Sequence, residues 1–84
     1  MTDNQPQTEM EKLLARVWGE VLEVDEISRS DTFIDLGGDS MDALQVIMKI
    51  EKELGVKLNH ERHFSLSLEQ AALELEEDVK KKNG

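Results

Sequence analysis

Apolar residues recur every three or four positions in three stretches of this chain, and this period restricts the fold more than any other feature. Such spacing gathers side chains on one face of an α-helix. The first stretch follows Thr8. Thr8 and Glu11 have the spacing of a capping box, so we expect a helix to begin at Thr8. Its apolar stripe consists of Met10, Leu13, Leu14, Val17, Trp18, Val21 and Leu22.

Two further main helices are predicted in the second half of the chain. The first runs from about Ser40 to Leu54, with Gly55 as its C-cap. Before the second, Ser67 and Gln70 form another capping-box pair, and a short helical turn is expected over 59–64. The pattern predicts an all-α, four-helix bundle of three main helices and one short helix, with a long first loop. The stripe of the last helix consists of Leu68, Ala71, Ala72, Leu75 and Val79.

Residues 23–39 connect the first two main helices, and a structureless loop of this length is unusual in a compact domain. Its apolar residues are therefore expected to pin the loop across the bundle. In the first helix, Trp18 is predicted to lie in the core, and Gly19 is predicted to mark the close approach of another segment. The apolar loop residues are Ile27, Phe33, Ile34 and Leu36.

The chain has 84 residues, enough for one small domain, which we expect at 8–80 between flexible tails at 1–7 and 81–84. With 10 basic and 19 acidic residues its net charge is −9, which disfavours nucleic acid as a partner and favours basic protein surfaces. The absence of cysteine excludes disulfides and thiolate metal sites. The polar N-terminus lacks a secretory signal, and the longest aliphatic run, Val46–Met48, is far too short to span a bilayer. We expect a cytoplasmic protein with no membrane partner.

The predicted second helix has two apolar faces. Ala43, Ile47, Ile50 and Leu54 share one face, which is expected to join the core. A second set lies well round the cylinder from that face, and two interpretations of it remain open. The long loop covers it, or it is an exposed patch that docks partner proteins through flexible thioethers. This second set is Met41, Leu44 and Met48.

The segment from Gly37 to Met41 places a serine hydroxyl at the start of that helix. Backbone N–H groups at a helix start are unpaired and carry partial positive charge, so a phosphate ester is favourably placed there. Asp39 can cap the helix as well as Ser40 can, and the glycines before it leave the approach to the hydroxyl open. Ser40 is therefore the best candidate to carry a covalent group.

Other chemistry is weakly supported. Ser40 lacks the Gly that follows the serine in a nucleophile elbow, and no strand precedes it, so we do not expect an enzyme. His60 and His63, the only histidines, are predicted to be solvated surface residues. Phe33 and Leu36 break the ligand pattern of a calcium-binding loop that begins at Asp31, so no metal site is expected.

The run from Asp31 to Met41 resembles the phosphopantetheine-attachment signature of acyl and peptidyl carrier proteins, and the resemblance extends from about Met10 to Leu75. It implies a four-helix bundle with a long first loop. It also implies that Ser40 accepts 4′-phosphopantetheine from coenzyme A through a separate transferase with Mg²⁺, and that the thiol of this arm carries acyl or aminoacyl thioesters.

By the same resemblance, Gly38 and Asp39 lie beside the cofactor and Asp39 helps to engage the transferase, while Met41, Leu44 and Met48 match positions that contact partners. We expect a stand-alone, monomeric carrier that serves nonribosomal-peptide or related secondary-metabolite assembly. Its expected partners are the phosphopantetheinyl transferase, an adenylating or acyl-transferring loading enzyme, and condensing or tailoring enzymes. The alternatives are a type II acyl carrier protein of fatty-acid or polyketide synthesis and, from another class, a cofactor-free acidic helical adaptor.

Overall fold

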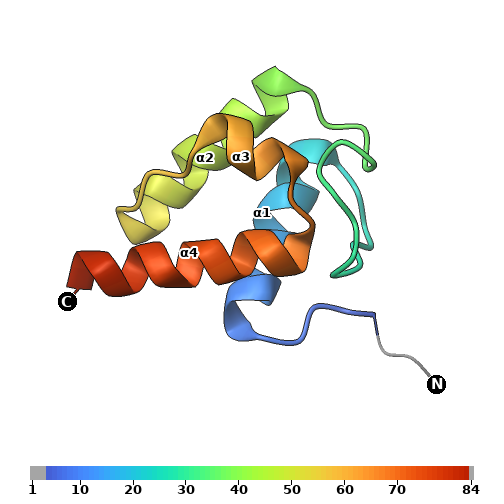
Figure 1. Ribbon diagram of the computed structural model, residues 1–84. Coiled ribbons are helices and arrows are strands. Elements are labelled where there is room, and N and C mark those ends of the chain that lie inside the picture. The colour runs from blue at the N-terminus through green and yellow to red at the C-terminus, as the bar shows by residue number, and fades with distance from the viewer. Residues whose placement is uncertain (1–3, 84) are drawn as a thin grey trace.

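A computed structural model describes residues 4–83 of the chain, without the side chain of His60. Over this range the chain forms an all-α bundle, with the long first loop between its first two helices (Figure 1). Helix α1 packs against α4 and α2, and α2 packs against the short α3. Apart from one isolated backbone bridge between Thr32 and Ser67, the described residues pair no extended segments. The predicted fold is confirmed. Its helices are α1 (Glu9–Leu22), α2 (Ser40–Leu54), α3 (His60–Ser65) and α4 (Leu68–Asn83).

Three of the predicted caps are present. Thr8 Oγ1 accepts a hydrogen bond from the backbone N–H of Glu11 at 3.0 Å, which fixes the start of α1. Ser67 and Gln70 exchange the two bonds of a capping box at the start of α4, at 3.4 and 3.3 Å. Gly55 ends α2 in the left-handed conformation, with φ of 70°. In residues 4–83, none of these helices is long and apolar enough to cross a membrane.

The core forms where the predicted stripes meet. Trp18 is fully buried, as expected, and the inward face of α2 is buried at Ala43, Ile47 and Ile50. The loop contributes Phe33, also fully buried. The expectation for Ile34 is wrong, because the turn that directs Phe33 inward leaves the Ile34 side chain 51% exposed.

Gly19 is a point of close approach, as predicted. A Cβ at this position would lie 2.9 Å from the carbonyl oxygen of Val24, because the chain folds back onto the last turn of α1. The Val24 N–H in turn donates to the Gly19 carbonyl oxygen at 3.2 Å. The loop therefore leaves α1 in a fixed direction.

A buried ion pair, which the sequence pattern does not predict, ties the loop to α1 and α4. Glu11 is only 2% exposed, and its two carboxylate oxygens accept hydrogen bonds from Arg29 Nε and Nη2 at 3.0 and 2.8 Å. Arg29 also pairs with Glu69 at 2.7 Å. The carbonyl oxygens of Arg29 and Asp31 accept hydrogen bonds from the N–H groups of Glu69 and Leu68, at 2.9 and 2.8 Å. This part of the loop thus caps α4.

The ion pair between Glu11 and Arg29 should make the free energy of unfolding depend on pH in acid. The hydrogen bonds from Arg29 lower the pKa of Glu11 below its ordinary value. A lowered pKa gives a stabilisation that is complete above the unfolded pKa, about 4.3, and is lost as the pH falls through the folded pKa. Glu11→Gln should lower the free energy of unfolding at pH 7 by at most about 3 kcal/mol, since Arg29 keeps Glu69 and is partly exposed. Urea unfolding of both proteins across pH should show the difference shrinking in acid, and a difference that persists below both pKa values would contradict this origin.

Both predicted tails make contacts where they are described. The Asn4 carbonyl oxygen accepts a hydrogen bond from the Arg29 N–H at 2.8 Å. Helix α4 continues to Asn83, beyond the expected domain end at residue 80, and Lys82 Nζ donates to the Gly55 carbonyl oxygen at 3.0 Å. Each contact satisfies a polar backbone group in the loop or at a helix end. Residues 1–3 and 84 lie outside the described residues.

The prediction that His63 is a solvated surface residue is wrong. The side chain is 3% exposed, and its Nε2 accepts a hydrogen bond from Trp18 Nε1 at 3.0 Å. A buried indole N–H needs an acceptor, and α3 supplies it once α3 packs on the bundle. The side chain of His60 is outside the described part of the structure.

Candidate attachment site at the start of α2

Ser40 is the first residue of α2 and is exposed, but it does not cap the helix. Asp39 does, because its Oδ1 accepts a hydrogen bond from the Asp42 N–H at 2.9 Å, and Asp42 Oδ2 accepts one from the Asp39 N–H at 3.3 Å. The expectation that Asp39 can take over the capping role is confirmed. The two capping bonds at the start of α2 are therefore made by Asp39 and Asp42.

The two glycines before the cap have different reasons to be glycine. Gly37 has φ of +91°, a region that side chains disfavour, and nothing lies within 4 Å of the place where its Cβ would be. A Cβ at Gly38 would overlap the ring of Phe33. The open approach predicted for both glycines thus holds for Gly37, whereas Gly38 makes room for a core side chain.

The start of α2 combines unpaired backbone N–H groups with acidic side chains. The α2 N-terminus presents N–H groups that favour a phosphate group on Ser40. Asp35 and Asp39 are exposed and lie close to Ser40 in the sequence. Residues 30–45 contain no Lys or Arg, so this segment provides no basic side chain at the site. Within the described residues, no group of three or more His, Cys, Asp and Glu side chains is arranged to hold a metal ion.

The second apolar face of α2 is exposed. Met41, Leu44 and Met48 are 67%, 47% and 60% exposed, so the interpretation that the long loop covers them is wrong. We call these three residues the α2 patch. The patch begins one residue after Ser40. Ile34, in the loop before Ser40, is a further exposed apolar residue, although its sequence predicts a place inside the bundle.

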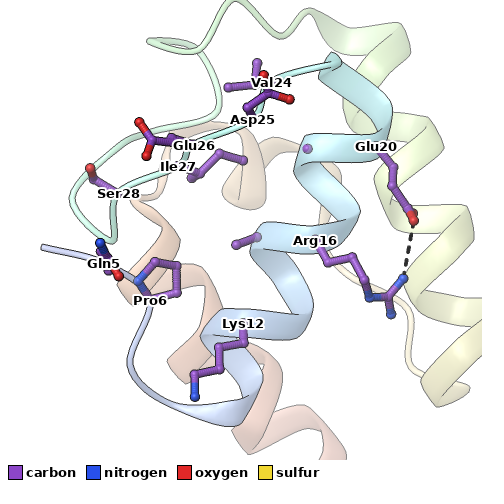
Figure 2. A pocket seen from close by; sticks show the side chains of 12 residues that line it. Gln5, Pro6, Lys12, Arg16, Glu20, Val24, Asp25, Glu26, Ile27 and Ser28 are labelled. Carbon is purple, nitrogen blue, oxygen red and sulfur yellow. Dashed lines mark ion pairs between the residues drawn. The ribbon is translucent and has the colours of Figure 1, made fainter.

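A groove of about 760 Å³ lies on another part of the molecule, between α1 and the beginning of the loop (Figure 2). Lys12 and Arg16 line it from α1, and Asp25 and Glu26 line it from the loop. All of its lining residues lie between positions 5 and 28, so Ser40 does not face into it. The Ser40 side chain therefore stands on the surface and not in this groove.

Comparison with known proteins identifies the family of this chain. The family model described as "Phosphopantetheine attachment site" matches residues 12–76. Tyrocidine synthase 2 of Brevibacillus parabrevis is 38% identical over 68 residues, or 81% of this chain. Bacitracin synthase 2 of Bacillus licheniformis is 47% identical over 47 residues, or 56% of this chain. This chain spans only 2% of the length of each of these two proteins.

Three solved structures share the fold. One, a docking-domain complex of the Pax NRPS, aligns with a TM-score of 0.86 at 28% identity and covers 100% of this chain and 82% of that chain. A second is a peptidyl carrier protein in complex with the phosphopantetheine transferase Sfp and coenzyme A, with a TM-score of 0.82, 27% identity, and coverage of 87% and 96%. The third, McyG A-PCP with phenylalanyl-adenylate, has a TM-score of 0.78, 31% identity, and coverage of 88% and 12%.

The family match includes the segment that carries Ser40, and the related proteins are peptide synthetases. This chain thus belongs to the phosphopantetheine-binding carrier proteins, as a carrier domain of the nonribosomal peptide synthetase type whose cofactor is 4′-phosphopantetheine.

Proposed function

We propose that Ser40 bears the 4′-phosphopantetheine arm and that the chain carries acyl or aminoacyl thioesters between biosynthetic enzymes. The observation that carries this proposal is the division of roles at the start of α2. Asp39 caps the helix, and the next residue, Ser40, is exposed. An ester on Ser40 would leave both bonds of the capping box in place.

The chain itself contributes position and electrostatics. The N–H groups of the first turn of α2 would stabilise the charge of a phosphodiester on Ser40. When bound, the arm supplies a thiol that forms thioesters. His63, the one histidine whose side chain is described, is buried and accepts a hydrogen bond from Trp18, and we expect a separate enzyme to remove the proton from the Ser40 hydroxyl. We therefore propose that the chain is a substrate of its transferase and has no catalytic activity of its own.

The proposed partners are a phosphopantetheinyl transferase, an adenylating or acyl-transferring loading enzyme, and condensing or tailoring enzymes. The likeness to carriers solved with Sfp and next to an adenylation domain supports the first two. The α2 patch and the acidic segment around Ser40 suit partners with an apolar contact surface and a basic rim.

The synthetase relatives support nonribosomal-peptide assembly over fatty-acid synthesis. The family match also argues against an adaptor without a cofactor. A stand-alone, monomeric carrier in the cytoplasm is part of the same proposal.

Mass spectrometry after incubation with coenzyme A, Mg²⁺ and a broad-specificity transferase tests the function. We expect each chain to gain one phosphopantetheine, and fragmentation should place the added mass on Ser40. A panel of adenylating enzymes then identifies the cargo that loads onto the arm. If a known carrier gains the arm under the same conditions and this chain does not, the proposed function is wrong.

Met48→Glu tests the α2 patch as a docking surface. The side chain is 60% exposed, so the free energy of unfolding should change by no more than about 0.5 kcal/mol. Loading should slow, because a charge that must be desolvated replaces an apolar contact. Leu73→Glu is the matched control, since Leu73 is 57% exposed but lies on α4. Equal loading rates for the two variants would move the docking surface away from α2.

A further inference from the structure

The ring of Phe33 occupies the space that a side chain at Gly38 would need, two residues before Ser40. We propose that Phe33 is a positioning residue for Ser40. Its ring fixes the position and direction of the backbone at Gly38, and this backbone leads into Ser40. This inference rests on the proposed attachment of the arm to Ser40. It assigns a mechanical role to a side chain of the core.

The Phe33 ring is itself held from two helices. It is fully buried, and the Trp18 ring of α1 meets it edge-on, with centroids 5.3 Å apart and planes at 71°. The ring centroids of His63 and Phe64, both on α3, lie 6.2 and 5.8 Å from the centroid of the Phe33 ring. A ring with neighbours on these sides cannot move aside without disturbing the core. It therefore forms a rigid support.

The same residue also holds Gly38 through the backbone. The Gly38 N–H donates to the Phe33 carbonyl oxygen at 3.0 Å, and the Gly37 N–H donates to the Ile34 carbonyl oxygen at 2.9 Å. Gly38 is thus fixed on one side by a ring and on another by a hydrogen bond. Asp39 follows as the helix cap and Ser40 as the first helical residue, so a shift at Gly38 is passed directly to Ser40.

Gly37 provides an internal contrast. Its Cβ position is open, and alanine there would be disfavoured by the backbone conformation alone. Substitutions at the two adjacent glycines should therefore differ in whether a second substitution can compensate for them. A smaller side chain at position 33 should relieve a substitution at Gly38 and should leave a substitution at Gly37 unrelieved.

The experiment measures transfer of phosphopantetheine to five variants by mass spectrometry, over a range of carrier concentrations. Gly38→Ala should lower kcat by up to about 10²-fold, the effect of displacing a reacting group by about 1 Å. KM for the carrier should change much less, because the α2 patch is intact. Adding Phe33→Leu to Gly38→Ala should restore much of kcat, whereas adding it to Gly37→Ala should not. Phe33→Leu alone gives the baseline, and circular dichroism confirms that each variant is folded at the assay temperature.

Two results would overturn the inference. The first is an unchanged kcat for Gly38→Ala. The second is a loss that Phe33→Leu fails to relieve, which would mean that Gly38 matters through direct contact with the transferase. If the wild-type chain gains no arm, the proposed function fails separately. The backbone amide NMR shifts of Asp39 and Ser40 then decide the inference, since they should move in Gly38→Ala and return toward wild type in the double variant.

Discussion

Ser40→Ala should abolish the gain of phosphopantetheine while the fold persists. Asp39 makes the capping bond to the Asp42 N–H, so removal of the Ser40 hydroxyl should cost at most about 1 kcal/mol of stability. Intact-mass measurement after reaction with coenzyme A and transferase reads out the modification, and urea unfolding reads out the stability. Ser65→Ala, at an exposed serine of α3, is the control and should still gain the arm.

A Ser40→Ala chain that still gained the added mass would show that the attachment site is elsewhere. A chain that lost both the modification and its fold would show that the hydroxyl does more for the start of α2 than the Asp39 cap suggests. The two measurements together therefore separate attachment from structure.

The second large effect is expected at Trp18. The side chain is fully buried, meets Phe33 edge-on and donates its indole N–H to His63 at 3.0 Å. Trp18→Ala should cost about 3–5 kcal/mol through the lost burial and the cavity left behind. Since small domains are stable by only about 5–15 kcal/mol, the variant should lose a large share of its stability. Urea unfolding followed by circular dichroism measures the change.

Trp18→Phe is the companion variant, because it keeps a ring in the core but leaves His63 Nε2 without the indole donor. It should lose less stability than Trp18→Ala and should unfold cooperatively. If Trp18→Ala unfolded within about 1 kcal/mol of wild type, the tryptophan would not be the central core residue that its burial indicates.

Local signals explain why most of the fold could be predicted from the sequence. The helices follow from stripes at a spacing of three and four, and their ends follow from short-range caps at Thr8, Asp39 and Gly55. The α2 patch could be predicted as a separate face, because its residues lie at a different angle around the helix axis from the residues of the core face. All of these features involve residues within one helix or one turn.

The features that could not be predicted join residues far apart in the chain. The bond between Trp18 and His63 spans 45 positions, and the pairing of Glu11 with Arg29 spans 18. No periodic pattern indicates such pairs, because they depend on how the helices pack. One signal is present, since Arg29 is the only basic residue between Arg16 and Lys49. A lone arginine in an acidic loop indicates a specific partner.

The packing of the Phe33 ring against Gly38 could not be predicted for a related reason. The sequence shows a glycine close to the attachment serine, and an open approach is one sufficient explanation for it. Only the position of the Phe33 ring shows that the space is filled. The exposure of Ile34 could not be predicted either, because the irregular turn that contains it has no regular inward and outward period.

Trp18 is the only tryptophan, and the chain has no tyrosine. The intrinsic fluorescence of this protein therefore comes from one indole, whose ring packs on the Phe33 ring that lies against Gly38. The emission colour and lifetime of this indole should respond to events at the start of α2, such as attachment of the arm, loading of cargo or arrival of an enzyme. Trp18 can therefore serve as an intrinsic fluorescent probe on the core side of the segment that leads into Ser40. No dye then needs to be attached to the surface that partners contact.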